Sequence, residues 1–238
     1  MLHLGIKTRL VRLARQIKGR LVDTGLHSEN FWANRTEIEG EQFAKGYWDS
    51  RKLPLRTYVA DAILGIPGVH DVLEVGCSAG PNVATIASRS KDLRIVGIDF
   101  DKDAVAFGNR LLKESHLENA RLEHATADRL PFENASFDLV LTCAVLSCIG
   151  PQKILGTLQE MKRVSRRGFV LFEPHRTGPD FLGAKGKTEH YPNTTYWLRD
   201  YQRLITEELK LPHVRFTEIQ IPPEHRVGHS QSGLIVLF

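Results

Sequence analysis

Between residues 71 and 174, short apolar segments alternate with segments of helical periodicity, and this alternation constrains the fold more than any other feature of the chain. Parallel strands need long crossover connections, which helices supply, and the helices then cover both faces of the sheet. The sequence therefore predicts an α/β domain built on a parallel sheet.

The predicted elements follow one another in a regular order. Strands are expected at 71–75, 94–99, 120–125, 136–143 and 168–174, with helices at 82–90, 102–116 and 151–165 between them. A helix at 196–209 and strands at 213–221 and 233–238 come next. The last two strands are too close in sequence for a helical crossover, so they are expected to pair antiparallel. The fold class is thus α/β, with a mostly parallel seven-stranded sheet that ends in a C-terminal antiparallel hairpin.

The first 26 residues differ in charge from the rest of the chain. They contain six Lys and Arg residues against the single acid Asp23, a net charge of +5, whereas the whole chain carries +4. Residues 2–22 have apolar side chains at three- and four-residue steps, which predicts a basic amphipathic helix. Three interpretations stay open: a solvated helix on its own domain, a helix on an anionic membrane surface, or a contact with nucleic acid or a protein.

The stretch "VLEVGCSAGPN", residues 72–82, predicts a strand, a tight turn and a helix N-terminus, an arrangement that brings backbone close to a ligand. The nicotinamide fingerprint G-x-G-x-x-G fails here, because Ser78 and Pro81 stand at its second and third glycine positions. The pattern E-x-G-x-G-x-G fits better, with Glu74, Gly76 and Gly80 matching and only Ser78 departing.

This stretch resembles motif I of the class I S-adenosylmethionine-dependent methyltransferases of the small-molecule type. Later segments agree: Asp99 ends the second strand, "ADRLPF" (127–132) follows the third, and "SFDLVLTCAVL" (136–146) resembles the fourth strand of the family. The resemblance implies a Rossmann-like three-layer sandwich, S-adenosylmethionine as cofactor and S-adenosylhomocysteine as product. It further implies a domain at 69–238, an N-terminal helical cap at 27–68 and an acceptor-side insertion at 174–195.

The resemblance also implies the cofactor site. Asp99 corresponds to the acid on the ribose hydroxyls and Asp128 to the residue that reads the adenine amino group, with Phe100 and Leu130 as walls for the ring. The full predicted set is Glu74, Gly76, Cys77, Ser78, Gly80, Asp99, Phe100, Asp128, Arg129, Leu130, Cys143 and Tyr47.

Structural roles compete with several of these assignments. Asp99 is also a candidate N-cap for a helix that begins at residue 101, and Asp128 a cap for a turn. Tyr47 and Trp48 either cover the methionyl end of the cofactor or pack the extension onto the sheet. Cys77 and Cys143 are expected to contribute backbone and bulk rather than thiol chemistry.

The expected reaction needs a general base only if the acceptor is protonated and weakly acidic. His175 and His229 are the candidates, on a rim that is also expected to include Glu173 and His225. The alternative is that these histidines lie at the surface without a catalytic role. No metal-ligand spacing is present, so no metal site is expected.

The sequence thus predicts an S-adenosylmethionine-dependent methyltransferase that modifies oxygen, nitrogen or carbon of a small or amphiphilic acceptor, including a lipid-like one. The alternatives are an RNA or protein methyltransferase and a non-catalytic cofactor-binding partner protein. Nucleic acid is not the expected acceptor, because the basic charge is confined to one segment. Three cysteines without a pairing pattern predict free thiols and a cytoplasmic protein, with residues 2–22 available for peripheral membrane contact.

Overall fold

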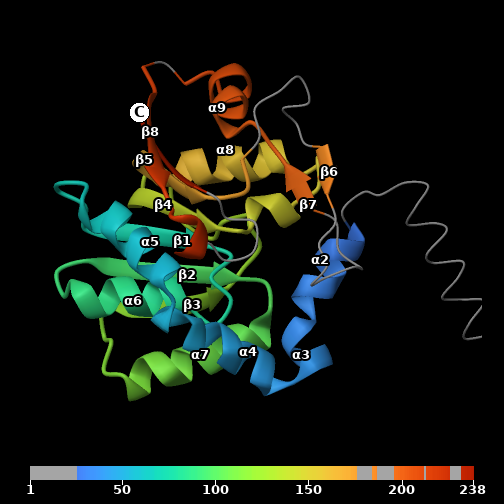
Figure 1. Ribbon diagram of the computed structural model, residues 1–238, viewed down its shortest axis with the longest axis vertical. Helices are drawn as coiled ribbons and strands as arrows, with labels where there is room; N and C mark the ends of the chain where they lie inside the picture. Colours follow the sequence, from blue (N-terminus) through green and yellow to red (C-terminus); the bar gives the residue numbers. More distant parts are fainter. Residues whose placement is uncertain (1–25, 176–183, 187–195, 212, 226–231) are drawn as a thin grey trace, which may run out of the picture.

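A computed structural model describes residues 26–175, 184–186, 196–211, 213–225 and 232–238 (Figure 1). Its centre is a seven-stranded sheet with the strand order β3-β2-β1-β4-β5-β9-β8. The first five strands are parallel, and β9 pairs antiparallel with both β5 and β8, as the short connection predicted. The strands are β1 (Asp71–Val75), β2 (Arg94–Asp99), β3 (Ala120–His124), β4 (Phe137–Cys143), β5 (Ser165–Phe172), β8 (Arg215–Gln220) and β9 (Ser232–Leu237).

Helices cover both faces of the sheet (Figure 1). One face packs against α5 (Pro54–Leu64), α6 (Pro81–Arg89) and α7 (Lys102–Glu114), and the other packs against α8 (Ile154–Val164) and the segment formed by α9 (Tyr201–Arg203) and the π-helical turn η3 (Leu204–Glu208). Successive side chains of a strand point to opposite faces. In β1, Val72 therefore belongs to the first core, whereas Leu73 and Val75 belong to the second.

The N-terminal extension consists of α2 (Leu26–Ala33), α3 (Arg35–Glu39), α4 (Glu41–Asp49) and the 3-10 turn η1 (Ser50–Lys52). Asp101, just after β2, holds this extension to the domain. Its Oδ2 accepts hydrogen bonds from the backbone N–H of Thr36 (2.9 Å) and from the Thr36 hydroxyl (2.7 Å). Its Oδ1 accepts from Asp103 N and Ala104 N, each at 3.1 Å, and so caps α7. One buried carboxylate thus joins the extension to the edge of the sheet.

The helix predicted at 196–209 is wrong at its start. Tyr196–Leu198 forms strand β7, which pairs antiparallel with β6 (Ala184–Gly186), and helical structure begins only at Tyr201. The two aromatic residues at the start, Tyr196 and Trp197, are buried, which suits their strand propensity. Asp200 then accepts a hydrogen bond from Arg203 N and caps the helical turn.

The other predicted elements differ from the structure only by shifts of boundary, of up to three residues. The largest shifts are in helix 151–165, which begins instead at Ile154, and in strand 168–174, which is found at Ser165–Phe172. Short 3-10 turns complete the described chain at Leu146–Cys148 (η2) and Pro223–His225 (η4).

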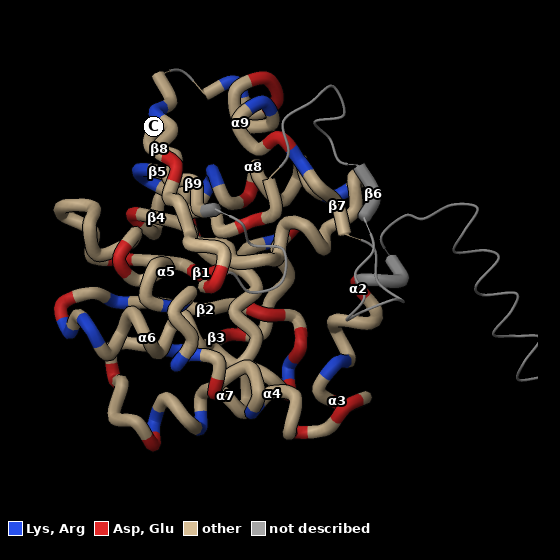
Figure 2. The backbone as a smooth tube through the Cα atoms, viewed as in Figure 1, with Lys and Arg blue, Asp and Glu red and all other residues tan. Residues whose placement is uncertain are grey.

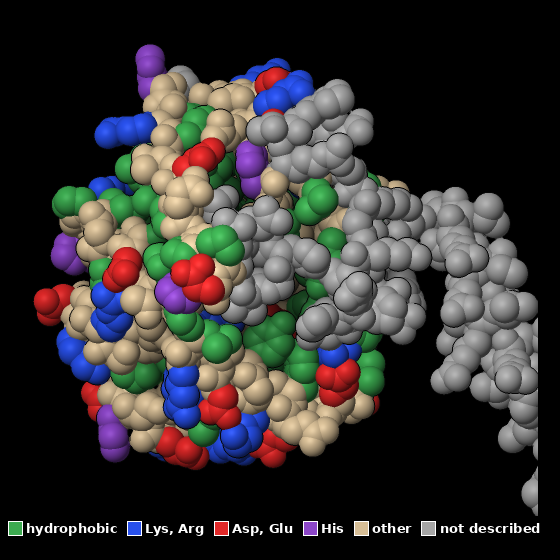
Figure 3. All heavy atoms as spheres, viewed as in Figure 1, with side chains coloured by type: hydrophobic (Ala, Val, Ile, Leu, Met, Phe, Trp, Pro, Cys, Tyr) green, Lys and Arg blue, Asp and Glu red, His purple; other side chains and the backbone are tan. Residues whose placement is uncertain are grey.

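The predicted helix at 2–22 lies outside the described residues. Within the described part of the chain, none of the helices combines the length and the apolar character that crossing a membrane requires. Lys and Arg are interspersed with Asp and Glu along the described backbone (Figure 2). The two kinds of charge are also mixed over the described surface that faces the viewer in Figure 3.

Candidate functional site

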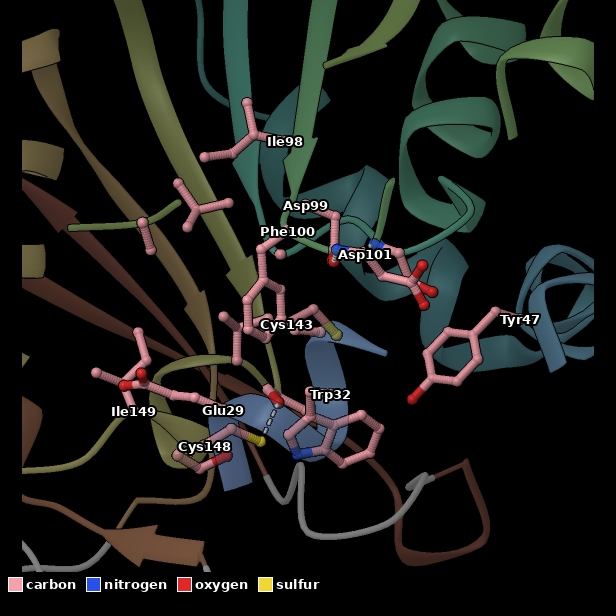
Figure 4. Close-up of a pocket in the computed structure, with 18 of the residues that line it drawn as sticks. Glu29, Trp32, Tyr47, Ile98, Asp99, Phe100, Asp101, Cys143, Cys148 and Ile149 are labelled. Carbon is pink, nitrogen blue, oxygen red and sulfur yellow. Dashed lines mark hydrogen bonds between the residues drawn. The ribbon is translucent and has the colours of Figure 1, made fainter. Parts of the chain in front are cut away.

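A cavity of about 1360 Å³ lies at the carboxyl ends of β1, β2 and β4, where ligands bind in open α/β sheets (Figure 4). Helices α2, α3 and α4 of the extension, together with the start of α5, form its opposite wall. Small-molecule sites commonly occupy about 300–1,000 Å³. The cavity is therefore large enough to hold a cofactor together with a second ligand.

The turn after β1 is built for close approach. Gly76 has φ +74° and Gly80, which precedes α6, has φ +80°, both in the left-handed region. A Cβ at Gly76 would lie 2.2 Å from Val145 Cγ2, and both residues line the cavity. Ser78 also adopts a positive φ, of 49°, so it follows the path of the glycine that the motif would place there. Backbone geometry thus requires glycine at both positions, and Gly76 lies at the cavity wall.

Asp99 ends β2 and is nearly buried at the cavity wall. Its Oδ2 accepts from Ser78 N (2.7 Å) and its Oδ1 from Asp101 N (2.9 Å). Because a carboxylate has about four lone-pair sites, it retains capacity to accept from two hydroxyl groups. The alternative role as a helix cap is wrong, since Asp101 caps α7. Burial raises the pKa of Asp99 to about 6, against the lowering effect of hydrogen bonds from Asp101 N and Ser78 N.

Asp128 lines the same cavity on the segment after β3, where it pairs with Lys153 (Nζ–Oδ2 3.4 Å). Burial raises the pKa of Asp128, but hydrogen bonds from Thr126 and Lys153 outweigh it and leave the pKa below its usual value. Lys153 also donates to Glu29 Oε2 on α2 at 2.8 Å, and this bond raises the pKa of Lys153. Lys153 thus connects the segment after β3 with the extension.

Glu74 does not reach the described wall of the cavity. It is 1 % exposed, and its Oε1 accepts from Asn82 Nδ2 at 2.6 Å. Arg56 Nη1 in turn donates to Asn82 Oδ1 at 3.1 Å. Burial raises the pKa of Glu74 to about 7, while the bond from Asn82 lowers it. Glu74 therefore supports the start of α6 through Asn82.

Replacement of Glu74 by glutamine is expected to stabilise the protein at pH 8. The raised pKa means that the folded protein holds this proton more tightly than the unfolded chain does, so the contribution of Glu74 to stability falls as pH rises from 4.5 to about 7. A neutral glutamine avoids this loss, which is worth up to about 3 kcal/mol. Urea unfolding at pH 5 and pH 8 measures the effect.

The matched control is Glu114→Gln, a change at an exposed position of α7. It should leave the free energy of unfolding within about 0.5 kcal/mol of the parent at both pH values. An equal effect of Glu74→Gln at the two pH values would contradict the assignment of the raised pKa to Glu74.

The two residues of the aromatic pair on α4 have different surroundings. The Tyr47 side chain lines the cavity (Figure 4). Trp48 is buried in the core, with the Arg51 guanidinium 4.8 Å from its ring centroid. Trp48 therefore packs the extension onto the domain, and cover of the methionyl end by Tyr47 stays a prediction.

The remaining predicted cofactor residues divide in the same way. Those whose described atoms line the cavity are Gly76, Ser78, Asp99, Phe100, Asp128, Cys143 and Tyr47. Cys77 and Leu130 are buried in the two cores, Arg129 is exposed, and Gly80 caps α6; none of these four is among the described residues of the cavity wall.

The predicted rim of acids and histidines does not form as expected. His175 lies away from the large cavity, where its Nδ1 accepts from Tyr201 N at 3.4 Å and its ring stacks on that tyrosine. His225 contacts Tyr58, with 3.1 Å between the ring Nδ1 and the hydroxyl. His229 lies outside the described residues. Glu173 is 2 % exposed, so it is a buried residue and not a rim residue.

Glu173 instead organises the loop after β4. Its carboxylate accepts from Val145 N (2.9 Å), Leu146 N (3.1 Å) and Ser147 N (3.2 Å). The fully buried Arg199 donates to the carbonyl oxygens of Leu146 and Ile149 from the other side. Burial raises the pKa of Glu173, and the three N–H donors oppose it. This arrangement fixes the backbone along one wall of the cavity.

Sequence reasoning missed Arg56, Trp32 and Lys153 as cavity residues. Arg56 is buried on α5 and donates to Ser50 Oγ (2.9 Å) as well as to Asn82. A charged residue within an apolar helical pattern is the signal that could have identified it. Trp32 and Lys153 carry no such local signal, because their positions depend on contacts between distant segments.

The described residues fit S-adenosylmethionine. The cavity wall combines a glycine turn that an added Cβ would obstruct, a carboxylate with free lone pairs at the end of β2 and a second acid after β3. These are the groups that binding of a nucleoside with an amino-acid tail requires. Within the described ranges, His, Cys, Asp and Glu side chains form no group of three or more that could hold a metal ion.

Residues 72–168 match the model of a protein family described as "Methyltransferase domain". By this match, the part of the chain from β1 to β5 is similar to the class I S-adenosylmethionine-dependent methyltransferases, as the sequence motifs suggested. The match covers the strands β1 to β4, helices α6 to α8 and the start of β5. The predicted fold class and the family's cofactor, S-adenosylmethionine, are thereby confirmed.

Similar proteins agree with this family. An O-methyltransferase of Pyrenophora dematioidea is 28 % identical over 61 % of this chain and 57 % of its own length. A tRNA N(3)-methylcytidine methyltransferase of Drosophila melanogaster is 28 % identical over 59 % of this chain and 45 % of its own. The chain spans about half the length of such curated relatives.

The methyltransferase fold is also shared with solved structures. One is the 1,6-didemethyltoxoflavin-N1-methyltransferase of Burkholderia thailandensis with bound 1,6-didemethyltoxoflavin and S-adenosylhomocysteine. It is 16 % identical, with a TM-score of 0.60 over 83 % of this chain and 85 % of that one. The similarity supports the fold, and the named relatives differ in the acceptor that they modify.

Proposed function

We propose that the chain transfers a methyl group from S-adenosylmethionine to a small or amphiphilic acceptor by in-line attack. The observation that carries the proposal is the cavity of about 1360 Å³, which joins the motif I turn and Asp99 to a wall of apolar and aromatic side chains. One ligand of cofactor size leaves part of that volume for an acceptor.

The chain's own residues would bind and orient the two ligands. Asp99 would accept from the ribose hydroxyls, Asp128 would accept from the adenine amino group, and Phe100 would pack on the adenine ring. Arg56, a cation in the cavity wall, would bind the methionyl carboxylate. S-adenosylmethionine supplies an activated methyl group on its sulfonium, so the protein contributes position and the exclusion of water.

Proton transfer by the cavity thiols is not part of this proposal. Burial raises the pKa of Cys143 to about 11 and that of Cys148 to about 12, so both remain protonated at neutral pH. His175 and His229 stay as untested candidates for a general base, and the structure places His175 outside the described wall of the large cavity. We therefore propose that orientation of the acceptor is the main contribution to rate.

The test has two steps. Calorimetric titration with S-adenosylhomocysteine is expected to give micromolar binding, and incubation with methyl-labelled S-adenosylmethionine and fractionated small-molecule extracts is expected to label one fraction. Binding without labelling of any fraction would favour the non-catalytic alternative. Absence of binding would overturn the proposal.

Arg56→Met is expected to weaken S-adenosylhomocysteine binding about 10- to 100-fold, since a hydrogen bond to a charged group is worth about 1.5–3 kcal/mol. Methylthioadenosine provides the matched control ligand because it lacks the amino-acid tail, and its affinity should change less than threefold. Calorimetry on the parent protein and on Arg56→Met with both ligands checks this. Equal losses for the two ligands would instead assign Arg56 a structural role through Asn82 and Ser50.

The second candidate is an RNA methyltransferase, which the named Drosophila relative favours. Retention on an RNA column that disappears when residues 1–26 are deleted would support it.

We also propose a cytoplasmic location, with or without membrane contact through residues 2–22.

A further inference from the structure

Four of the residues that line the cavity are not among those assigned to the cofactor: Trp32 from α2, Cys148 and Ile149 from the loop after β4, and Tyr196 from β7. In Figure 4, Trp32, Cys148 and Ile149 lie apart from Asp99 and Asp101. Figure 4 shows the Trp32 side chain and the Tyr47 ring reaching into the space next to Phe100. We call the part lined by Trp32, Cys148, Ile149 and Tyr196 the second compartment. Its wall of rings and aliphatic carbon suits a molecule with a flat apolar body.

The aromatic part of this wall is held from behind. The guanidinium of the buried Arg35 lies 5.7 Å from the ring centroid of Trp32 and 4.3 Å from that of Phe31, which packs edge-on against Trp32 with centroids 5.2 Å apart. Arg35 also lies 4.8 Å from the ring centroid of Phe43 and forms an ion pair with Glu39. Phe43 in turn packs against Tyr47, with ring centroids 4.9 Å apart. Cation–π contacts of this kind fix the rings in place. The extension therefore presents a preformed surface.

Acidic side chains outnumber basic ones on the described wall of the whole cavity. The basic ones are Arg56 and Lys153, and the acidic ones are Glu29, Glu39, Asp99, Asp101 and Asp128. Bound S-adenosylmethionine, with a sulfonium and an ammonium group against one carboxylate, would leave an acidic excess. Low-dielectric walls strengthen the field of such an excess inside a cleft.

Resting on the proposed function, we infer that the second compartment selects ring-bearing acceptors that are uncharged or cationic and rejects anionic ones. The cations on the described wall are Lys153 and Arg56, and both already contact partners. A carboxylate, sulfate or phosphate group would therefore meet the acidic excess without a cation to pair with. A neutral ring or a ring-bearing amine meets aromatic faces and carboxylates, which are the groups that bind it favourably.

The ion pair Glu29–Lys153 allows charge to be separated from structure. Glu29→Gln and Lys153→Met both remove the ion pair between α2 and the start of α8, and Lys153→Met also removes the partner of Asp128. A purely structural role predicts the same change of ligand preference in both variants. A role in charge selection predicts opposite changes, because one variant removes an acid and the other removes a base.

The experiment screens a library of ring fragments of equal size, sorted into cations, neutral molecules and anions at pH 7.5, against the full chain saturated with S-adenosylhomocysteine. Ligand-observed NMR gives the hit rate of each class, and titration of shared hits gives affinities. Hits are expected among neutral molecules and cations. The ratio of cation to anion affinity should fall about three- to tenfold in Glu29→Gln and rise by a similar factor in Lys153→Met.

The inference would be overturned by preferential binding of anions, by the absence of ring-fragment hits, or by a change of the cation-to-anion affinity ratio in the same direction in both variants. Binding of S-adenosylhomocysteine is measured first in each variant. If the parent protein does not bind S-adenosylhomocysteine, the proposed function has failed. If it binds S-adenosylhomocysteine but its ring-fragment hits are mainly anions, only the charge selection has failed.

Discussion

Asp99→Asn is expected to weaken S-adenosylhomocysteine binding by about 100-fold. The carboxylate is nearly buried at the end of β2 and already accepts from Ser78 N and Asp101 N, so its remaining lone pairs are the ones available to the ribose. Asparagine keeps the shape but offers one acceptor oxygen instead of two. The loss of about two hydrogen bonds to a charged group is worth about 3 kcal/mol. Calorimetry at pH 8, well above the pKa of about 6, measures it.

Asp101→Asn is the matched control two residues away. Asp101 also lines the cavity, but its two oxygens are used by Thr36 and by the first turn of α7. This variant is expected to lower the free energy of unfolding by about 1–2 kcal/mol, because an amide NH2 cannot accept the hydrogen bonds from Thr36 although asparagine still caps α7, with at most a tenfold change in binding. A larger binding defect in Asp101→Asn than in Asp99→Asn would contradict the ribose assignment.

The affinity of the parent protein should also depend on pH. Protonation of Asp99 removes acceptor capacity, so S-adenosylhomocysteine binding is expected to weaken as pH falls below about 6. Asp99→Asn should lack this dependence between pH 5 and pH 8. A common slope in both proteins would place the titrating group elsewhere.

Glu173→Ala is expected to destabilise the fold by about 3–5 kcal/mol. The change removes the acceptor for three backbone N–H groups and leaves the fully buried Arg199 without the opposite charge that faces it across the loop. Chemical unfolding monitored by circular dichroism measures the loss. The conservative Glu173→Gln retains one acceptor and should recover more than half of it.

The same pair of variants tests positioning of the cavity wall. Because the loop at 144–149 lines the cavity, Glu173→Gln is expected to change the affinity for ring fragments while leaving methylthioadenosine affinity within about threefold of the parent. A Glu173→Ala protein as stable as the parent would show that the loop holds its conformation without this carboxylate.

The sheet could be predicted from the sequence because local patterns determine it. β1 and β2 have the predicted bounds, since each is a short apolar run whose neighbours on both sides are parallel strands. β7 could not be predicted, because Tyr196–Leu198 becomes a strand by pairing with the short segment β6 (Ala184–Gly186), which carries no strand pattern of its own. Local helical periodicity continues through those residues, so non-local pairing overrides it.

The site was predictable to a similar degree. Asp99 and Asp101 both stand at the strand end, and spacing alone does not distinguish the helix cap from the ligand residue; the hydrogen bonds do. Glu173 follows a buried strand as a rim residue would, yet its side chain turns inward to the loop N–H groups. Trp32 and Lys153 reach the cavity through packing of the extension, which no local motif encodes.

The position of β9 has a consequence for synthesis on the ribosome. β9 lies between β5 and β8, although residues 173–231 separate it from β5 in the chain. Translation proceeds from the N-terminus, so the apolar edge of β5 emerges long before its neighbour exists. During that interval the nascent chain exposes an unpaired strand edge, a known site of misassembly. Slow translation between β5 and β9 should therefore increase the need for chaperones, and a pulse-chase comparison of fast- and slow-codon genes would measure it.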